Sequence, residues 1–169
     1  MRMLTACILA SMLSLPAAAL AEADPERVRV EIPESAESRS IVDAFSRQIA
    51  VTPNGKPQQV SVSAPIQFEF GSARLTPAGR SLLEVIATAL NDPALIANTF
   101  VIEGHTDAVG SAESNLLLSR QRAKAVKQYL VAHGVVSGRL SAAGYGEYRL
   151  LKGKSSDDAA HRRVELVRE

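Results

Sequence analysis

Apolar and polar residues alternate between positions 59 and 70, as they do in a half-buried β-strand. A period of two places every second side chain on the same face. The sequence therefore predicts one strand or a pair of strands here, ended by the Gly-Ser-Ala run at residues 71–73. The alternating apolar residues are Val60, Val62, Ile66, Phe68 and Phe70.

Two later segments repeat their apolar residues with the period of an α-helix. Thr76 can cap the first, which has proline at its first position and ends before an Asn-Asp-Pro stop. Ser111 or Ser114 can cap the second, which runs to about His133 and is followed by glycine. The predicted buried residues are Leu82, Leu83, Ile86 and Leu90 in the first helix, and Leu118, Ala123, Val126 and Leu130 in the second.

Further strand patterns cover residues 99–105, 139–146 and 163–167. The resulting order is strand, helix, strand, helix, strand, strand. It predicts an α/β fold, a two-layer sandwich in which helices pack on one face of a small mixed sheet. The polar segment 147–161 is expected to be a mobile loop.

Residues 1–21 have the features of a cleavable secretory signal peptide. A basic start, an apolar run over residues 4–15 and a small-residue Ala-Leu-Ala site predict cleavage after Ala21. The run is shorter than the roughly 20 residues that a spanning helix needs. Most of the apolar run follows Cys7 instead of preceding it, which disfavours lipidation unless translation starts upstream. We therefore expect a periplasmic protein without a transmembrane span or a disulfide.

Residues 22–58 are expected to be a flexible lead, and residues 59–169 the folded domain. The first part of the lead is rich in Glu, Arg, Ser and Pro, as linkers often are. A short amphipathic helix is predicted near residues 40–51, with Ile41, Phe45 and Ile49 on one face. This helix could pack on the edge of the domain or bind another envelope protein, which would make the chain an adaptor.

Composition disfavours several classes of function. Removal of Arg2 with the signal, which contains no acidic residue, changes the formal charge from +1 to neutral. A neutral chain with 4% aromatic residues is a poor candidate for nucleic-acid binding. No phosphate-binding glycine motif is present, and the three histidines are far apart in the sequence. We therefore expect neither a cofactor nor a metal.

Candidate chemistry is concentrated in residues 104–123. Asp107 follows a predicted strand, and strand ends commonly bear ligands in α/β folds. Arg122 lies on the next helix, one turn after Leu118, while Asn115 lies in the first turn, where backbone N–H groups are free. Carboxylate and guanidinium together could hold a zwitterion. Alternatively, Asp107 and Arg122 could simply pair with each other.

A hydrolase is a weaker alternative. Ser119, His105 and Asp107 supply the residue types of a catalytic triad. However, no G-x-S-x-G elbow is present, and Ser119 falls inside a predicted helix. We therefore expect a binding protein and no enzyme.

The chain from about residue 66 to 166 resembles the OmpA-like carboxy-terminal domain family, which includes OmpA, Pal and MotB. The resemblance rests on the segments IQFEFGSARL, GHTD, GYGE and RRVEL, with the residues between GHTD and Val126. It implies non-covalent binding of peptidoglycan through the diaminopimelate residue of the stem peptide, and a role in attaching the cell wall to the outer membrane. The implied binding residues are Asp107, Arg122, Thr106, Asn115, Leu118 and Arg162.

Two positions depart from the family pattern. Leu150 lies near a position where proline is usual, and His161 takes the place of asparagine. Both changes leave Asp107 and Arg122 unaltered. They bear on how the last loop closes and on whether Arg162 contributes to binding.

Overall fold

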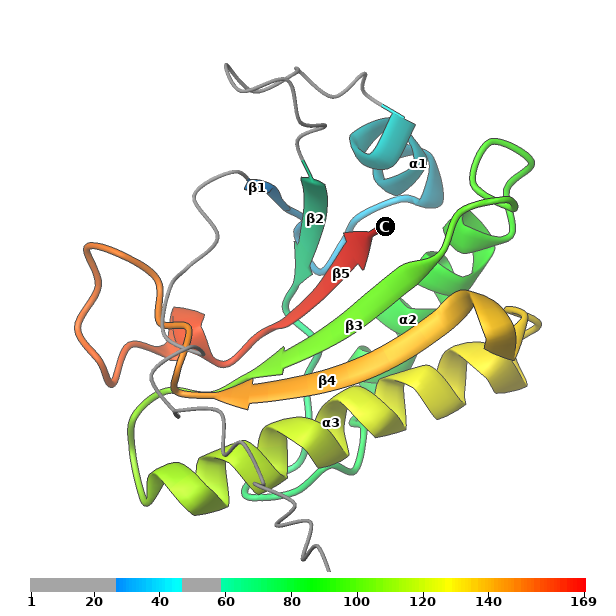
Figure 1. Ribbon diagram of the computed structural model, residues 1–169. Helices are drawn as coiled ribbons and strands as arrows, with labels where there is room; N and C mark the ends of the chain where they lie inside the picture. Colours follow the sequence, from blue (N-terminus) through cyan, green and yellow to red (C-terminus); the bar gives the residue numbers. More distant parts are fainter. Residues whose placement is uncertain (1–26, 47–58) are drawn as a thin grey trace, which may run out of the picture.

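The computed structural model describes residues 27–46 and 59–169, which form a five-stranded mixed sheet and three α-helices (Figure 1). The strand order is β1-β2-β5-β3-β4. Strand β5 pairs antiparallel with β2 and β3, whereas β1 with β2 and β3 with β4 are parallel. The strands are β1 Arg27–Glu31, β2 Gln59–Ala64, β3 Phe100–His105, β4 Leu140–Gly146 and β5 Val164–Arg168.

The helices are α1 Ser38–Ser46, α2 Pro77–Leu90 and α3 Ala112–Ala132, with single 3-10 turns at Ser137–Arg139 and Ala159–His161. Their apolar faces meet the sheet in one continuous core. Figure 1 shows α3 running alongside β4 for the length of that strand. The predicted α/β sandwich and its β-α-β-α-β-β order after residue 59 are confirmed.

Helix starts follow the predicted caps. The Thr76 hydroxyl accepts a hydrogen bond from the N–H of Gly79 at 3.1 Å, and Ser111, rather than Ser114, caps α3. The second part of the 59–70 prediction was wrong. Strand β2 ends at Ala64, Phe68 makes only an isolated bridge, and Phe70 is fully exposed.

The expectation of a flexible lead was wrong for the part that the structure describes. Strand β1 extends the sheet in register with β2, and α1 packs into the core. Ile41 and Phe45 are both fully buried, and the Phe45 ring meets Phe100 edge-on at 5.1 Å. The face that the adaptor hypothesis required is therefore occupied by the protein itself. The signal peptide, Ile49 and the linker after it lie outside the described residues.

Glycines let α3 lie directly on the sheet. A Cβ atom at Gly104 would lie 2.3 Å from the carbonyl oxygen of Ser119, and one at Gly144 would lie 2.3 Å from the backbone nitrogen of Arg120. No side chain fits at such distances. This close packing fixes the position of α3 relative to the end of β3, where the candidate site lies.

Candidate functional site

A cavity of about 460 Å³ opens where β3 ends and α3 begins. All six residues predicted as binding residues line it. The remaining lining comes from the loop before α2 and from the turn after Asp107. The lining residues are Phe68, Glu69, Phe70, Gly71, Thr106, Asp107, Val109, Asn115, Leu118, Arg122 and Arg162.

Asp107 is fixed by contacts on both carboxylate oxygens. The residue is 7% exposed and lies two positions after β3. Its Oδ1 accepts a hydrogen bond from the N–H of Val109 at 3.3 Å, and its Oδ2 pairs with Nη1 of Arg162 at 2.6 Å. The carboxylate is therefore held in place at the wall of the cavity, with lone pairs left over for a cationic group.

Arg122 reaches the same cavity from the middle of α3. Its Nε donates to the carbonyl of Ser72 at 3.0 Å, and its guanidinium lies over the Phe68 ring at 5.0 Å. Within the described residues, the two Nη atoms of Arg122 have no hydrogen-bond partner. Burial and the nearby Arg162 lower the pKa of Arg122, while Asp107 opposes that change. The group remains a cation with free donors for an anion.

Asp107 and Arg122 do not pair with each other, so the alternative of a simple Asp107–Arg122 ion pair was wrong. Asp107 pairs instead with Arg162, which lies 55 positions later in the chain. The Arg162 side chain is half exposed. Such a pair contributes little to stability, and a ligand can compete with it.

Thr106, Asn115 and Leu118 hold or line the site. Thr106 is 3% exposed, and its Oγ1 has no hydrogen-bond partner within the described residues. The Asn115 amide lies 3.2 Å from the carbonyls of Asp107 and Val109, so it joins α3 to the turn. Leu118 adds half-buried apolar surface. Asn115 is thus a positioning residue for Asp107.

His161, one of the two departures from the family pattern, anchors the last loop. It is fully buried, its Nδ1 accepts from the N–H of Leu151, and its Nε2 donates to the Ser155 carbonyl at 2.7 Å. The loop is also joined to the site, because the N–H of Ala108 donates to the Ser156 carbonyl at 2.8 Å. The loop that carries Arg162 is therefore tied to the turn after Asp107.

A buried charge cluster behind the cavity was missed from the sequence. Glu103, His105 and Glu165 place ligand-type atoms within 4.8 Å of one another, so His105 is not isolated. Arg27 pairs with Glu103 at 2.7 Å and Arg29 with Glu165 at 2.8 Å. Two more cations complete the cluster, Arg149 and Arg163. Four guanidinium groups around two carboxylates oppose a further cation, so the cluster is structural.

The hydrolase alternative does not fit this geometry. Ser119 is fully buried, and its Oγ donates to the Leu116 carbonyl and accepts from the N–H of Gly146, both at 2.8 Å. Gly104 faces α3, so the adjacent His105 side chain points to the opposite side of the sheet. Serine and histidine therefore cannot act together.

The model of the OmpA family matches residues 67–163, which cover more than half of the chain and include every residue that lines the cavity. The chain belongs to the OmpA family. A peptidoglycan-associated lipoprotein of Pseudomonas putida is 40% identical over 101 residues, which cover 59% of each protein. Outer membrane protein A of Klebsiella pneumoniae is 34% identical over 102 residues, or 60% of this chain and 30% of that protein.

A solved structure supports the assignment of the OmpA-like fold. The peptidoglycan-associated lipoprotein from Burkholderia pseudomallei matches with a TM-score of 0.53 at 29% identity, over 63% of this chain and 89% of that one. The chain spans about a third of the length of the outer membrane proteins that it matches. Among the described residues of this OmpA-family chain, no helix is long and apolar enough to cross a membrane.

Proposed function

We propose that this OmpA-family chain is a non-catalytic protein of the cell envelope that binds peptidoglycan without a covalent bond. The names of its relatives, which include peptidoglycan-associated lipoproteins and outer membrane proteins, support the envelope role. The observation that carries the proposal is local. A buried carboxylate and a half-buried guanidinium line one cavity without pairing with each other.

The proposed ligand group is the diaminopimelate residue of the stem peptide. Its free end carries an ammonium and a carboxylate on one carbon. The ammonium would lie against Asp107, which only accepts hydrogen bonds when ionised, and the carboxylate against the Nη atoms of Arg122. Arg162 would either share the carboxylate or move from Asp107 as the ammonium arrives. Thr106 supplies a hydroxyl that can donate or accept, and Leu118 packs against the aliphatic chain.

The proposed compartment is the periplasm. The basic start, apolar run and Ala-Leu-Ala site of residues 1–21 support export, and peptidoglycan would be accessible to the exported chain. Mass spectrometry of the protein purified from the envelope tests this proposal. We expect an amino terminus at Glu22, whereas an intact Met1 in the envelope fraction would refute cleavage.

Retention on isolated sacculi tests wall binding. We expect the wild type to sediment with sacculi and the Asp107→Ala, Arg122→Ala double variant to stay in the supernatant. Lys124→Ala is the matched control, because it removes a cation from the same helix without touching the cavity. Equal retention of wild type and double variant would show that the assigned site is wrong.

Free ligand distinguishes diaminopimelate recognition from general adhesion to the wall. In an NMR titration, diaminopimelate should shift the backbone amide signals of residues 106–109 and the side-chain signals of Arg122. Nα-acetyl-lysine amide, which keeps the side-chain ammonium but has no free carboxylate, should shift them much less. Similar shifts with both compounds would refute the assigned specificity while leaving wall binding itself intact.

A further inference from the structure

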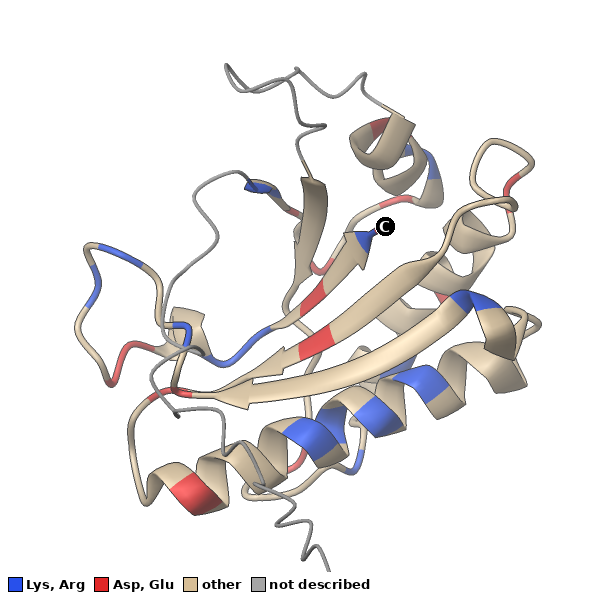
Figure 2. Ribbon diagram, viewed as in Figure 1, with Lys and Arg blue, Asp and Glu red and all other residues tan. Residues whose placement is uncertain are grey.

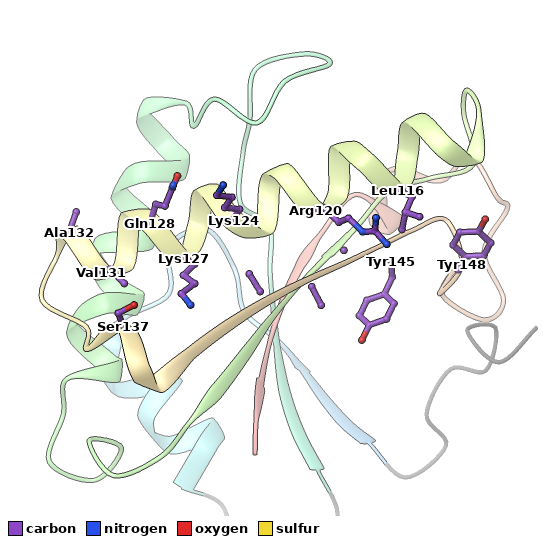
Figure 3. Close-up of a pocket in the computed structure, with 13 residues that line it drawn as sticks. Leu116, Arg120, Lys124, Lys127, Gln128, Val131, Ala132, Ser137, Tyr145 and Tyr148 are labelled. Carbon is purple, nitrogen blue, oxygen red and sulfur yellow. The ribbon is translucent and has the colours of Figure 1, made fainter. Parts of the chain in front are cut away.

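A second hollow of about 940 Å³ lies between α3 and β4 (Figure 3). It shares no lining residue with the cavity around Asp107. We name it the β4 groove. Its lining is Leu116, Arg120, Lys124, Lys127, Gln128, Val131, Ala132, Ser137, Ala142, Ala143, Gly144, Tyr145 and Tyr148.

The β4 groove runs along an open edge of the sheet. Among the strands that the structure describes, β4 is the last in the order and pairs only with β3, so alternate N–H and C=O groups on its other side have no partner in any described strand. The opposite edge strand, β1, has the sequence RVRVE, in which charges discourage pairing with another chain. Strand β4 has the sequence LSAAGYG, which contains no charge. Of the two edges, β4 is therefore the one suited to accept a strand.

Helix α3 places a row of cations beside this edge. Arg120, Lys124 and Lys127 follow one another at spacings of four and three, which puts them on one helix face. Figure 2 shows the basic positions along α3, and Figure 3 shows the three side chains between the ends of the groove. None of the three forms a salt bridge within residues 27–46 and 59–169. The groove lining contains no acidic residue to offset them.

Apolar side chains close the two ends of the groove. Tyr148 is 40% exposed and lies at one end near Leu116, and Val131 is 36% exposed at the other end. An occupant would thus meet apolar contacts at both ends and cations in the middle. A strand of about seven residues, at roughly 3.3 Å per residue, matches the length of β4.

We propose that the β4 groove binds an extended acidic peptide segment of another envelope protein. The segment would pair with β4 as an added strand and place its carboxylates against Arg120, Lys124 and Lys127. Backbone pairing supplies affinity in such complexes, and complementary charge supplies specificity and a faster encounter. A phosphate polymer would satisfy the cations but could not pair with alternating N–H and C=O groups. The edge therefore favours a polypeptide.

Fluorescence anisotropy with the full chain tests the proposal. The probe is a labelled seven-residue peptide of alternating glutamate and valine, and the comparison peptide replaces every glutamate with lysine. We expect the acidic peptide alone to bind. Binding should weaken about tenfold in the Lys124→Glu, Lys127→Glu variant, because two attractions become repulsions. The matched control is Arg39→Glu, Lys152→Glu, which changes the net charge equally on other surfaces and should leave binding unchanged.

Strand pairing is tested with N-methylated probes. Two versions of the acidic peptide, methylated on alternate sets of backbone nitrogens, should differ in affinity, because only one set faces β4. Hydrogen exchange of outward-facing β4 amides should also slow when the unmodified peptide is bound. Equal binding of the unmodified acidic peptide and its two methylated versions would overturn the proposal. Equal binding of the acidic peptide to the wild type and to the Lys124→Glu, Lys127→Glu variant would also overturn it.

Sedimentation velocity distinguishes a partner from a second copy of this chain. We expect the wild type to be monomeric at the concentrations of the peptide assay. A dimer that dissociates in the Lys124→Glu, Lys127→Glu variant would show that the groove joins two copies, and the proposed occupant would then be wrong. Retention on sacculi should be the same in this variant as in the wild type, because the two sites share no residue.

Discussion

The placement of α1 in the core predicts a large cost for Phe45→Ala. Phe45 is fully buried, meets Phe100 edge-on and lies among the apolar residues of the core. Removal of a buried phenylalanine side chain costs about 3–5 kcal/mol, through lost burial and the cavity left behind. Domains of this kind have total stabilities of about 5–15 kcal/mol, so the variant should lose a large fraction.

Urea unfolding followed by circular dichroism measures this loss. We expect the midpoint to fall without a large change in the slope, which would show that the folded state remains cooperative. In thermal unfolding, at about 3 °C per kcal/mol, the melting temperature should fall by roughly 10 °C. Phe45→Leu provides a milder second variant, in case Phe45→Ala does not fold.

Phe70→Ala is the matched control, because it makes the same chemical change at a fully exposed position. It should alter the free energy of unfolding by no more than about 0.5 kcal/mol. A loss below about 1 kcal/mol in Phe45→Ala would refute the reasoning. It would mean that the β1–α1 unit detaches from the sheet in solution, as the prediction of a flexible lead requires.

Three further outcomes follow from the geometry. Arg162→Ala removes a half-exposed ion pair with Asp107, so the free energy of unfolding, measured in urea, should change by less than about 1 kcal/mol. Gly144→Ala forces a methyl group against α3 and should cost about 1–3 kcal/mol in the same assay, whereas Gly138→Ala, which has open space, should not. Burial and surrounding arginines, Arg163 first among them, hold the pKa of His105 well below 6.5. The unfolded chain therefore takes up a proton at His105 more readily than the folded protein does. The contribution of His105 to the free energy of unfolding is complete above pH 6.5 and declines as the pH falls below it, by at most about 1.4 kcal/mol per pH unit. His105→Gln should remove this decline, so that its urea midpoints change less with pH between pH 5 and 7 than those of the wild type.

The sequence was sufficient for elements that depend on local signals. Thr76 and Ser111 cap their helices because each side chain reaches an N–H three positions later, which is visible as a short motif. The meeting of Asp107 with α3 was also predictable, since a strand end and the next helix start are neighbours in space. Local patterns therefore placed Asp107, Asn115 and Arg122 near one another, whereas Thr106 and Arg162 were predicted only from the family resemblance.

Contacts between distant segments could not be predicted in the same way. Arg122 donates a hydrogen bond to the carbonyl of Ser72, which is 50 positions away. Asp107 forms its ion pair with Arg162 and not with Arg122. Which arginine reaches a carboxylate depends on how the final loop returns to the sheet. That path is set by the buried His161, and no local pattern reports it.

Strand β1 was missed because its stabilising partners lie across the whole sheet. Its composition is that of a linker, but Arg27 and Arg29 pair with Glu103 and Glu165, which face each other on β3 and β5. Two adjacent buried carboxylates would repel each other without cations, and these arginines offset that repulsion. The same charges that make β1 look disordered in isolation therefore fix it in the folded protein. Its alternation of Arg and Val then satisfies both sides of the sheet, with Val30 against the core and the arginines over the acidic pair.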